Sequence, residues 1–97
     1  MPELTFVSRW PDGHRLASYS PSLVVSEHLD AGAWYPVADF VRRSGEALRT
    51  ASARVEARYG FPCGRAAASL AEIEAVAARY PGGEVLVERL TPRRGAA

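Results

Sequence analysis

Residues 37–79, VADFVRRSGEALRTASARVEARYGFPCGRAAASLAEIEAVAAR, decide the fold because they hold two helical patterns joined by a very short link. In the first pattern, apolar residues recur at spacings of three and four, which predicts a helix from Val37 to Tyr59 with one apolar stripe. That stripe consists of Val37, Phe40, Val41, Ser44, Leu48, Ala51, Val55 and Tyr59. The second pattern predicts a helix from Cys63 to Arg79, with a stripe of Ala66, Leu70, Ile73, Ala77 and Tyr80. The link Gly60-Phe61-Pro62 is so short that the two helices must be antiparallel neighbours.

The residues on either side of this helix pair predict a small sheet. Residues 4–10 alternate and place Leu4, Phe6 and Trp10 on one face, and residues 14–19 return as a second strand after the turn Pro11-Asp12-Gly13. Residues 84–90 predict a further strand. The economical packing is an α+β fold, in which a small antiparallel sheet (N-terminal hairpin plus C-terminal strand) packs against an antiparallel two-helix hairpin. The other face of the sheet is then left for solvent, a partner or a second copy of the chain in a homodimer.

Two segments give less direct signals. Ser20 followed by Pro21 is typical of a helix start, whereas Leu23-Val24-Val25 favours a strand. We expect a short helix over residues 21–29, with a strand as the alternative. The chain is expected to form one domain over residues 1–90, and residues 91–97 are expected to form a flexible C-terminal tail.

Composition narrows the function classes. The 97 residues are 47% hydrophobic and 24% charged, as is usual for one globular domain. The net charge of +1 argues against a nucleic-acid partner. The N-terminus lacks the pattern of a signal peptide, and no apolar stretch is long enough to span a membrane. We therefore expect a cytoplasmic protein with no nucleic-acid or membrane partner.

Cys63 is the most reactive side chain in the sequence and the weak candidate for catalysis. A cysteine that begins a helix near Arg65 has a favoured thiolate, although a small buried side chain is the alternative interpretation. A cysteine nucleophile needs a base, and the sequence places neither His14 nor His28 beside Cys63. The chain has one cysteine and no histidine pair at helical spacing, so we expect no disulfide, metal or cofactor.

Two further groups are candidates for binding. Trp10 and Asp12 could form a binding tip at the hairpin turn, because Trp is a frequent interface anchor; the alternative is turn chemistry beside a core aromatic. Arg42, Arg43 and Arg49 form a basic edge on the first helix, which is either a solvated face or a clamp for an acidic partner.

Four motifs carry a resemblance to a known family. They are Arg9-Trp10-Pro11-Asp12-Gly13, Tyr19-Ser20-Pro21-Ser22, Tyr35-Pro36-Val37-Ala38-Asp39-Phe40 and Tyr59-Gly60-Phe61-Pro62-Cys63. In combination they resemble a family of small bacterial proteins named for a nitrogen-starvation response, over residues 1–80. Pro62 departs from the pattern, in which a small residue such as Ala is expected, and it could stiffen the link.

The resemblance has consequences for function. It implies genes that lie beside those for a nitrilase, a radical-SAM protein, an acetyltransferase and a flavin-dependent oxidoreductase, in a cluster associated with nitrile or cyanide nitrogen assimilation. It implies no catalytic residues. We therefore expect a non-catalytic accessory or interaction protein with protein partners from the same pathway. The alternatives are a small enzyme or ligand carrier that uses Cys63, and a small-metabolite sensor.

Overall fold

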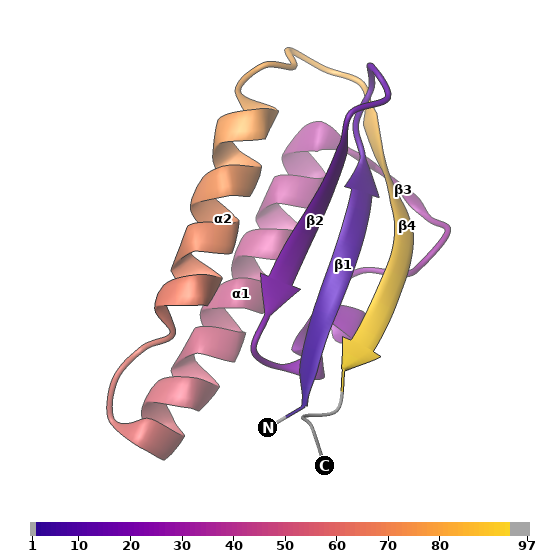
Figure 1. The fold of residues 1–97 in the computed structure, drawn as a ribbon. Coiled ribbons are helices and arrows are strands. Elements are labelled where there is room, and N and C mark those ends of the chain that lie inside the picture. The colour runs from indigo at the N-terminus through magenta and orange to yellow at the C-terminus, as the bar shows by residue number, and fades with distance from the viewer. Residues whose placement is uncertain (1, 94–97) are drawn as a thin grey trace.

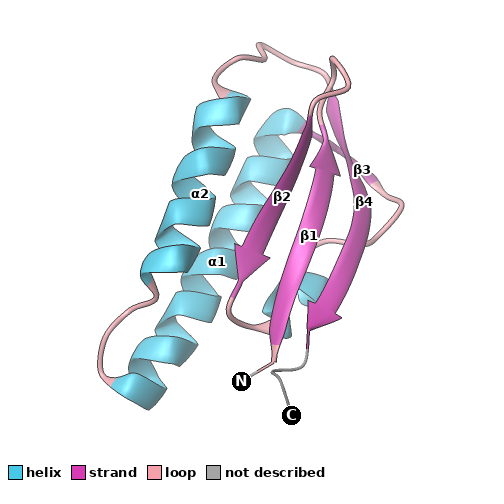
Figure 2. Ribbon diagram, viewed as in Figure 1, coloured by secondary structure: helices cyan, strands magenta, loops and turns pink. Residues whose placement is uncertain are grey.

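The computed structural model describes residues 2–93 and confirms the α+β fold (Figure 1). Its elements, in chain order, are β1 (Glu3–Arg9), β2 (Arg15–Ser20), the 3₁₀ helix η1 (Leu23–Glu27), β3 (Trp34–Pro36), α1 (Val37–Tyr59), α2 (Gly64–Ala77) and β4 (Glu84–Arg93). The strands form one antiparallel sheet in the order β2-β1-β4-β3. The antiparallel pair α1 and α2 lies against one face of this sheet, as Figure 2 shows.

The hairpin turn follows from local chemistry, as predicted. The Trp10 amide donates to the His14 carbonyl at 2.8 Å, and the Gly13 amide donates to the Trp10 carbonyl at 2.8 Å. Gly13 adopts a φ of 92°, which a residue with a side chain rarely accepts. The Asp12 carboxylate accepts from the His14 amide at 3.0 Å and closes the turn.

The structure corrects the prediction at three places. The short helix is confirmed in kind, but it begins later, because Ser22 rather than Ser20 caps it by accepting from the Val24 amide at 3.2 Å. A fourth strand, β3, was not predicted. The predicted tail is wrong for residues 91–93, which pair with residues 3–5 of β1 as the end of β4, while residues 94–97 lie outside the described residues.

The core lies between the sheet and the helix pair. Leu4, Phe6 and Trp10 are buried on the helix side of the sheet, as the alternation predicts. The buried side chains of α1 end at Ala51, although the predicted stripe continues to Tyr59. Lengths explain this difference. The stretch from Val37 to Ala51 rises about 21 Å, close to the roughly 20–23 Å length of β1 and β2, whereas the whole of α1 is about 34 Å long.

The end of the helix pair therefore extends beyond the sheet, as the lower left of Figure 1 shows. We call this end the helix joint; it consists of residues 55–65, in which α1 ends and α2 begins. Gly60 ends α1 with a φ of 88°, and its amide donates to the Glu56 carbonyl at 2.8 Å.

The other face of the sheet carries an ion-paired cluster near the β1–β2 turn. The register of β1 and β4 shifts by one residue after Val7, and Glu88 is the extra residue. Its carboxylate lies 3.3 Å from Arg9 Nε and 3.1 Å from Arg15 Nε. Trp34, at the β3 edge, is the exposed aromatic that pairs with Leu86 across the sheet.

Candidate functional site

Trp10 is a core residue, so it offers no exposed ring to a partner. Its side chain is 1% exposed, stacks on Tyr80 with ring centres 5.6 Å apart, and meets Phe40 edge to face at 5.4 Å. Its indole Nε1 donates to Ser8 Oγ at 3.1 Å, which satisfies its polar atom inside the core. The structure therefore agrees with the alternative interpretation, in which Trp10 is a core aromatic beside a turn.

Asp12 joins the hairpin turn to the segment after α2. Its carboxylate accepts from the Tyr80 hydroxyl at 2.7 Å and from the His14 amide at 3.0 Å. The Tyr80 hydroxyl, and after it the His14 amide, hold the pKa of Asp12 below its ordinary value, and the same carboxylate raises the pKa of Tyr80. Asp12 is therefore engaged in holding two parts of the fold together.

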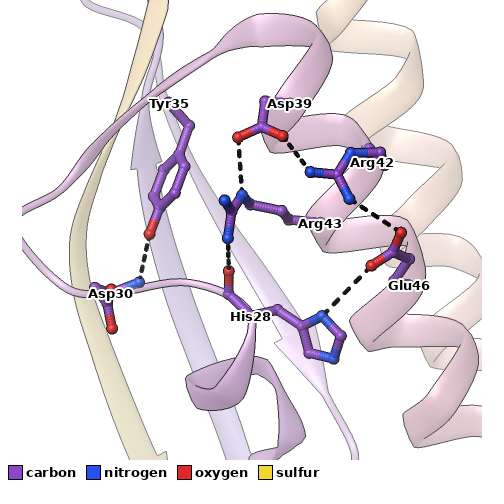
Figure 3. A network of polar contacts seen from close by, with 7 residues as sticks. All are labelled: His28, Asp30, Tyr35, Asp39, Arg42, Arg43 and Glu46. Carbon is purple, nitrogen blue, oxygen red and sulfur yellow. Dashed lines mark hydrogen bonds and ion pairs between the residues drawn. The ribbon is translucent and has the colours of Figure 1, made fainter.

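Arg42 and Arg43 belong to a polar network that ties α1 to the segment around β3 (Figure 3). Arg43 Nε donates to Asp39 at 2.8 Å, its NH1 donates to the His28 carbonyl at 3.0 Å, and its guanidinium carbon lies 4.9 Å from the Tyr35 ring centre. Arg42 binds Asp39 and, at 3.2 Å, Glu46. The hydrogen bonds from Arg43 and then from Arg42 lower the pKa of Asp39. Both guanidinium charges are thus balanced within the helix.

Arg49 lies apart from this network. Its guanidinium folds over Gly45, and a Cβ atom at that glycine would lie 3.0 Å from its NH1 atom. It also lines a shallow groove between α1 and α2 with Ser52, Ala66 and Leu70 among its neighbours. The three arginines therefore do not form one basic edge. Arg42 and Arg43 face the β3 side, and Arg49 faces α2.

Cys63 occupies the predicted position at the start of α2. It is the N-cap residue, its side chain is half-buried, and its amide donates to Ser52 Oγ at 3.2 Å. The residue lines a pocket of about 220 Å³ at the helix joint. The other lining residues are Glu3, Tyr19, Pro21, Val55 and Tyr59.

Neither histidine reaches this pocket. His14 lies five residues along β2 from Tyr19, a distance of about 16 Å. His28 lies beside Glu46, with 3.8 Å between Nδ1 and the carboxylate, and Glu46 is about 13 Å along α1 from the pocket residue Val55. The structure brings together Cys63 and Arg65 near one pocket but adds no histidine base.

Each of the two tyrosines of the pocket lies within cation–π distance of an arginine. The guanidinium carbon of Arg65 lies 3.6 Å from the ring centre of Tyr19, and that of Arg58 lies 5.7 Å from the ring centre of Tyr59. The Tyr19 hydroxyl donates to Glu3 at 3.2 Å, and burial, followed by the Glu3 charge, raises the pKa of Tyr19. Ser69 Oγ donates to the Tyr19 carbonyl at 2.8 Å and fastens α2 to β2.

The helix joint also exposes aromatic side chains. Tyr59 is 53% exposed and Phe61 is 66% exposed. The pocket, Phe61, Arg58 and Arg65 together are called the joint surface below. The sequence interpretation missed this surface except for Cys63. The signal that could have found it is length, because the apolar stripe of the first helix is longer than the predicted strands.

Among residues 2–93, no group of three or more His, Cys, Asp or Glu residues is placed to hold a metal ion. Within the same residues, neither helix combines the length and the apolar character needed to cross a membrane.

Residues 5–90 match the family described as nitrogen starvation-induced protein NitG. The chain belongs to the NitG family. The matched range of this NitG chain includes both helices and the joint surface except Glu3, and it ends within β4. No curated protein and no solved structure matches the chain. The NitG description gives the setting, a protein induced by nitrogen starvation, and confirms the nitrogen-starvation part of the predicted resemblance.

Proposed function

We propose that this NitG protein is a non-catalytic accessory protein that docks on a protein partner in the nitrogen-starvation response through its joint surface. The observation that carries the proposal is the exposure of Tyr59 and Phe61 at an end of the helix pair that the sheet does not cover. Large aromatic side chains are favoured anchors of protein interfaces.

The overhang itself supports a role outside folding. Residues of α1 beyond Ala51 are half-buried or exposed, so the last turns of the helix add little to the core. Their aromatic side chains nevertheless cost solubility when they face water. A partner that covers Tyr59 and Phe61 would offset that cost, and it would explain why the helix hairpin extends beyond its buried part.

The partners that we propose are the enzymes of a nitrile or cyanide nitrogen-assimilation cluster. The test is a pull-down of each separately expressed cluster product, namely the nitrilase, the radical-SAM protein, the acetyltransferase and the flavin-dependent oxidoreductase, with the purified chain. We expect one of them to bind the wild type and the Trp34→Ala variant, and to lose binding to the Tyr59→Ala/Phe61→Ala variant. Trp34 is a matched control because it is an exposed aromatic on β3, away from the joint. Absence of binding to every product, or equal binding by all variants, would contradict the proposal.

One observation favours a second candidate, a small enzyme or ligand carrier that uses Cys63. The thiol is half-buried in the wall of a pocket rather than sealed in the core. A metabolite sensor would use the same pocket. The rate of alkylation by iodoacetamide at neutral pH separates these cases from docking. A thiol that reacts no faster than free cysteine, together with a flat thermal-shift screen of nitrogen metabolites, would remove the second candidate.

A further inference from the structure

The arginines of the described chain differ in what neutralises them. Four of them, Arg9, Arg15, Arg42 and Arg43, are ion-paired with Glu88, Asp39 or Glu46. Arg58 and Arg65 are exposed, and within residues 2–93 neither lies within ion-pair distance of a carboxylate. Arg65 is instead stacked on Tyr19, and Arg58 lies within cation–π distance of Tyr59.

Stacking prepares a guanidinium for an anionic partner. Contact with an aromatic face fixes the plane of the guanidinium and leaves its in-plane N–H groups available to a carboxylate. Part of the side-chain entropy lost on binding is therefore already lost in the free protein. Arg54, which donates to Ser22 Oγ at 3.2 Å near the pocket residue Pro21, adds a third positive charge at this end.

The joint pocket is lined by the two tyrosines that these arginines approach, and its size and charge favour an apolar occupant. Its volume of about 220 Å³ is below the roughly 300–1,000 Å³ of sites for larger small molecules, so it suits one large side chain. Its single carboxylate, Glu3, accepts a hydrogen bond from Tyr19 and repels an acid inside the pocket. Acidic groups are therefore favoured outside the pocket, where Arg58 and Arg65 lie.

We propose that the joint surface binds an acidic segment of a partner protein, with one large apolar side chain of the segment in the pocket and flanking Asp or Glu side chains on Arg58 and Arg65. The inference rests on the proposed docking function and specifies the chemistry of the partner. Charge complementarity favours this occupant, because Arg54, Arg58 and Arg65 outnumber the two carboxylates at this end, Glu3 and Glu56.

The first experiment selects peptides from a random displayed library on the immobilised full chain at low salt. We expect the enriched sequences to combine a large apolar residue with nearby Asp or Glu. Enrichment of basic or uncharged sequences, or no enrichment at all, would overturn the inference.

The second experiment measures the affinity of an enriched peptide by fluorescence anisotropy. We expect Arg58→Gln and Arg65→Gln each to weaken binding about fivefold to tenfold, and added salt to weaken the wild type further. The matched control is Arg79→Gln, which removes an exposed arginine at the other end of α2 and should bind like the wild type. Circular dichroism verifies that each variant is folded. Equal affinity of the Arg58→Gln/Arg65→Gln variant and the wild type would refute the assigned role of these arginines.

Two further outcomes separate this inference from the proposed function. If a cluster enzyme binds through Phe61 but is insensitive to Arg58→Gln/Arg65→Gln, the docking function stands and the acidic-segment inference is wrong. If acidic peptides bind while every cluster enzyme fails to bind, the acidic-segment inference stands and the proposed cluster partners are wrong. Light scattering tests for self-association. If the wild type is a dimer and the Arg58→Gln/Arg65→Gln variant is a monomer, the joint surface binds a second copy of the chain, and the inferred acidic partner is wrong.

Discussion

Replacing Phe61 by Ala should change the stability of the protein only slightly, although Phe61 is among its largest apolar side chains. Complete burial of a Phe side chain contributes about 1.5–3 kcal/mol. Phe61 is 66% exposed, so about a third of that value, roughly 0.5–1 kcal/mol, is at stake. The same change at Phe40, which is fully buried under Trp10, should cost about 3–5 kcal/mol, because it also leaves a cavity.

The assay is urea unfolding of the Phe61→Ala and Phe40→Ala variants, monitored by circular dichroism. We expect nearly the same slope against denaturant for Phe61→Ala and the wild type, with a small shift of the midpoint. A loss above about 2 kcal/mol for Phe61→Ala would refute the reasoning, because the side chain would then have to be buried in solution. In that case the joint would be part of the fold, and its exposed aromatics would no longer support docking.

Three other changes test the structural roles assigned above. Trp10→Ala should lower the free energy of unfolding by about 3–5 kcal/mol in guanidinium titrations, and an unaffected stability would contradict the core position of Trp10. Tyr80→Phe removes the main cause of the lowered pKa of Asp12, so this pKa should move up toward the ordinary value of an aspartate in an NMR titration. Because a lowered pKa stabilises the fold above the unfolded-state pKa and this gain is lost as the pH falls, the variant should lose less stability on acidification than the wild type. Arg43→Gln should cost about 1 kcal/mol in thermal unfolding, through its bond to the His28 carbonyl, and more than Arg42→Gln; equal losses would argue against the network.

Local signals predicted most of the fold. The turn Pro11-Asp12-Gly13 was predictable because each residue has a conformational or hydrogen-bonding preference that needs no other part of the chain. The two long helices were predictable because their apolar periodicity extends over many turns. By contrast, the three-residue strand β3 contains Pro36 and no polar–apolar alternation in its sequence, and it exists because β4 supplies its partner. The end of β4 was missed for the same reason, since residues 91–93 are strand through pairing with β1.

The candidate site was less predictable, because it depends on how long the packed elements are relative to one another. The helical stripe predicted that Tyr59 faces the core, and the periodicity itself is correct. Burial requires something to pack against, however, and beyond Ala51 no side chain of α1 is fully buried. The arginines also could not be told apart from the sequence alone. Arg43 donates hydrogen bonds to Asp39 and to the His28 carbonyl, whereas Arg58 is not ion-paired within the described residues.

The short link of the helix hairpin matters both for the fold and for the docking that we propose. For folding, Gly60 ends α1 in a left-handed conformation, and the link turns the chain so that α2 packs beside α1. For docking, the same shortness holds Phe61 between Gly60 and Pro62, and a proline ring fixes its own φ and restricts the residue before it. A side chain on a restricted backbone loses less entropy on binding than one on a flexible loop. Pro62 therefore strengthens the case for an interface at the joint, because it stiffens the link where an exposed aromatic is presented.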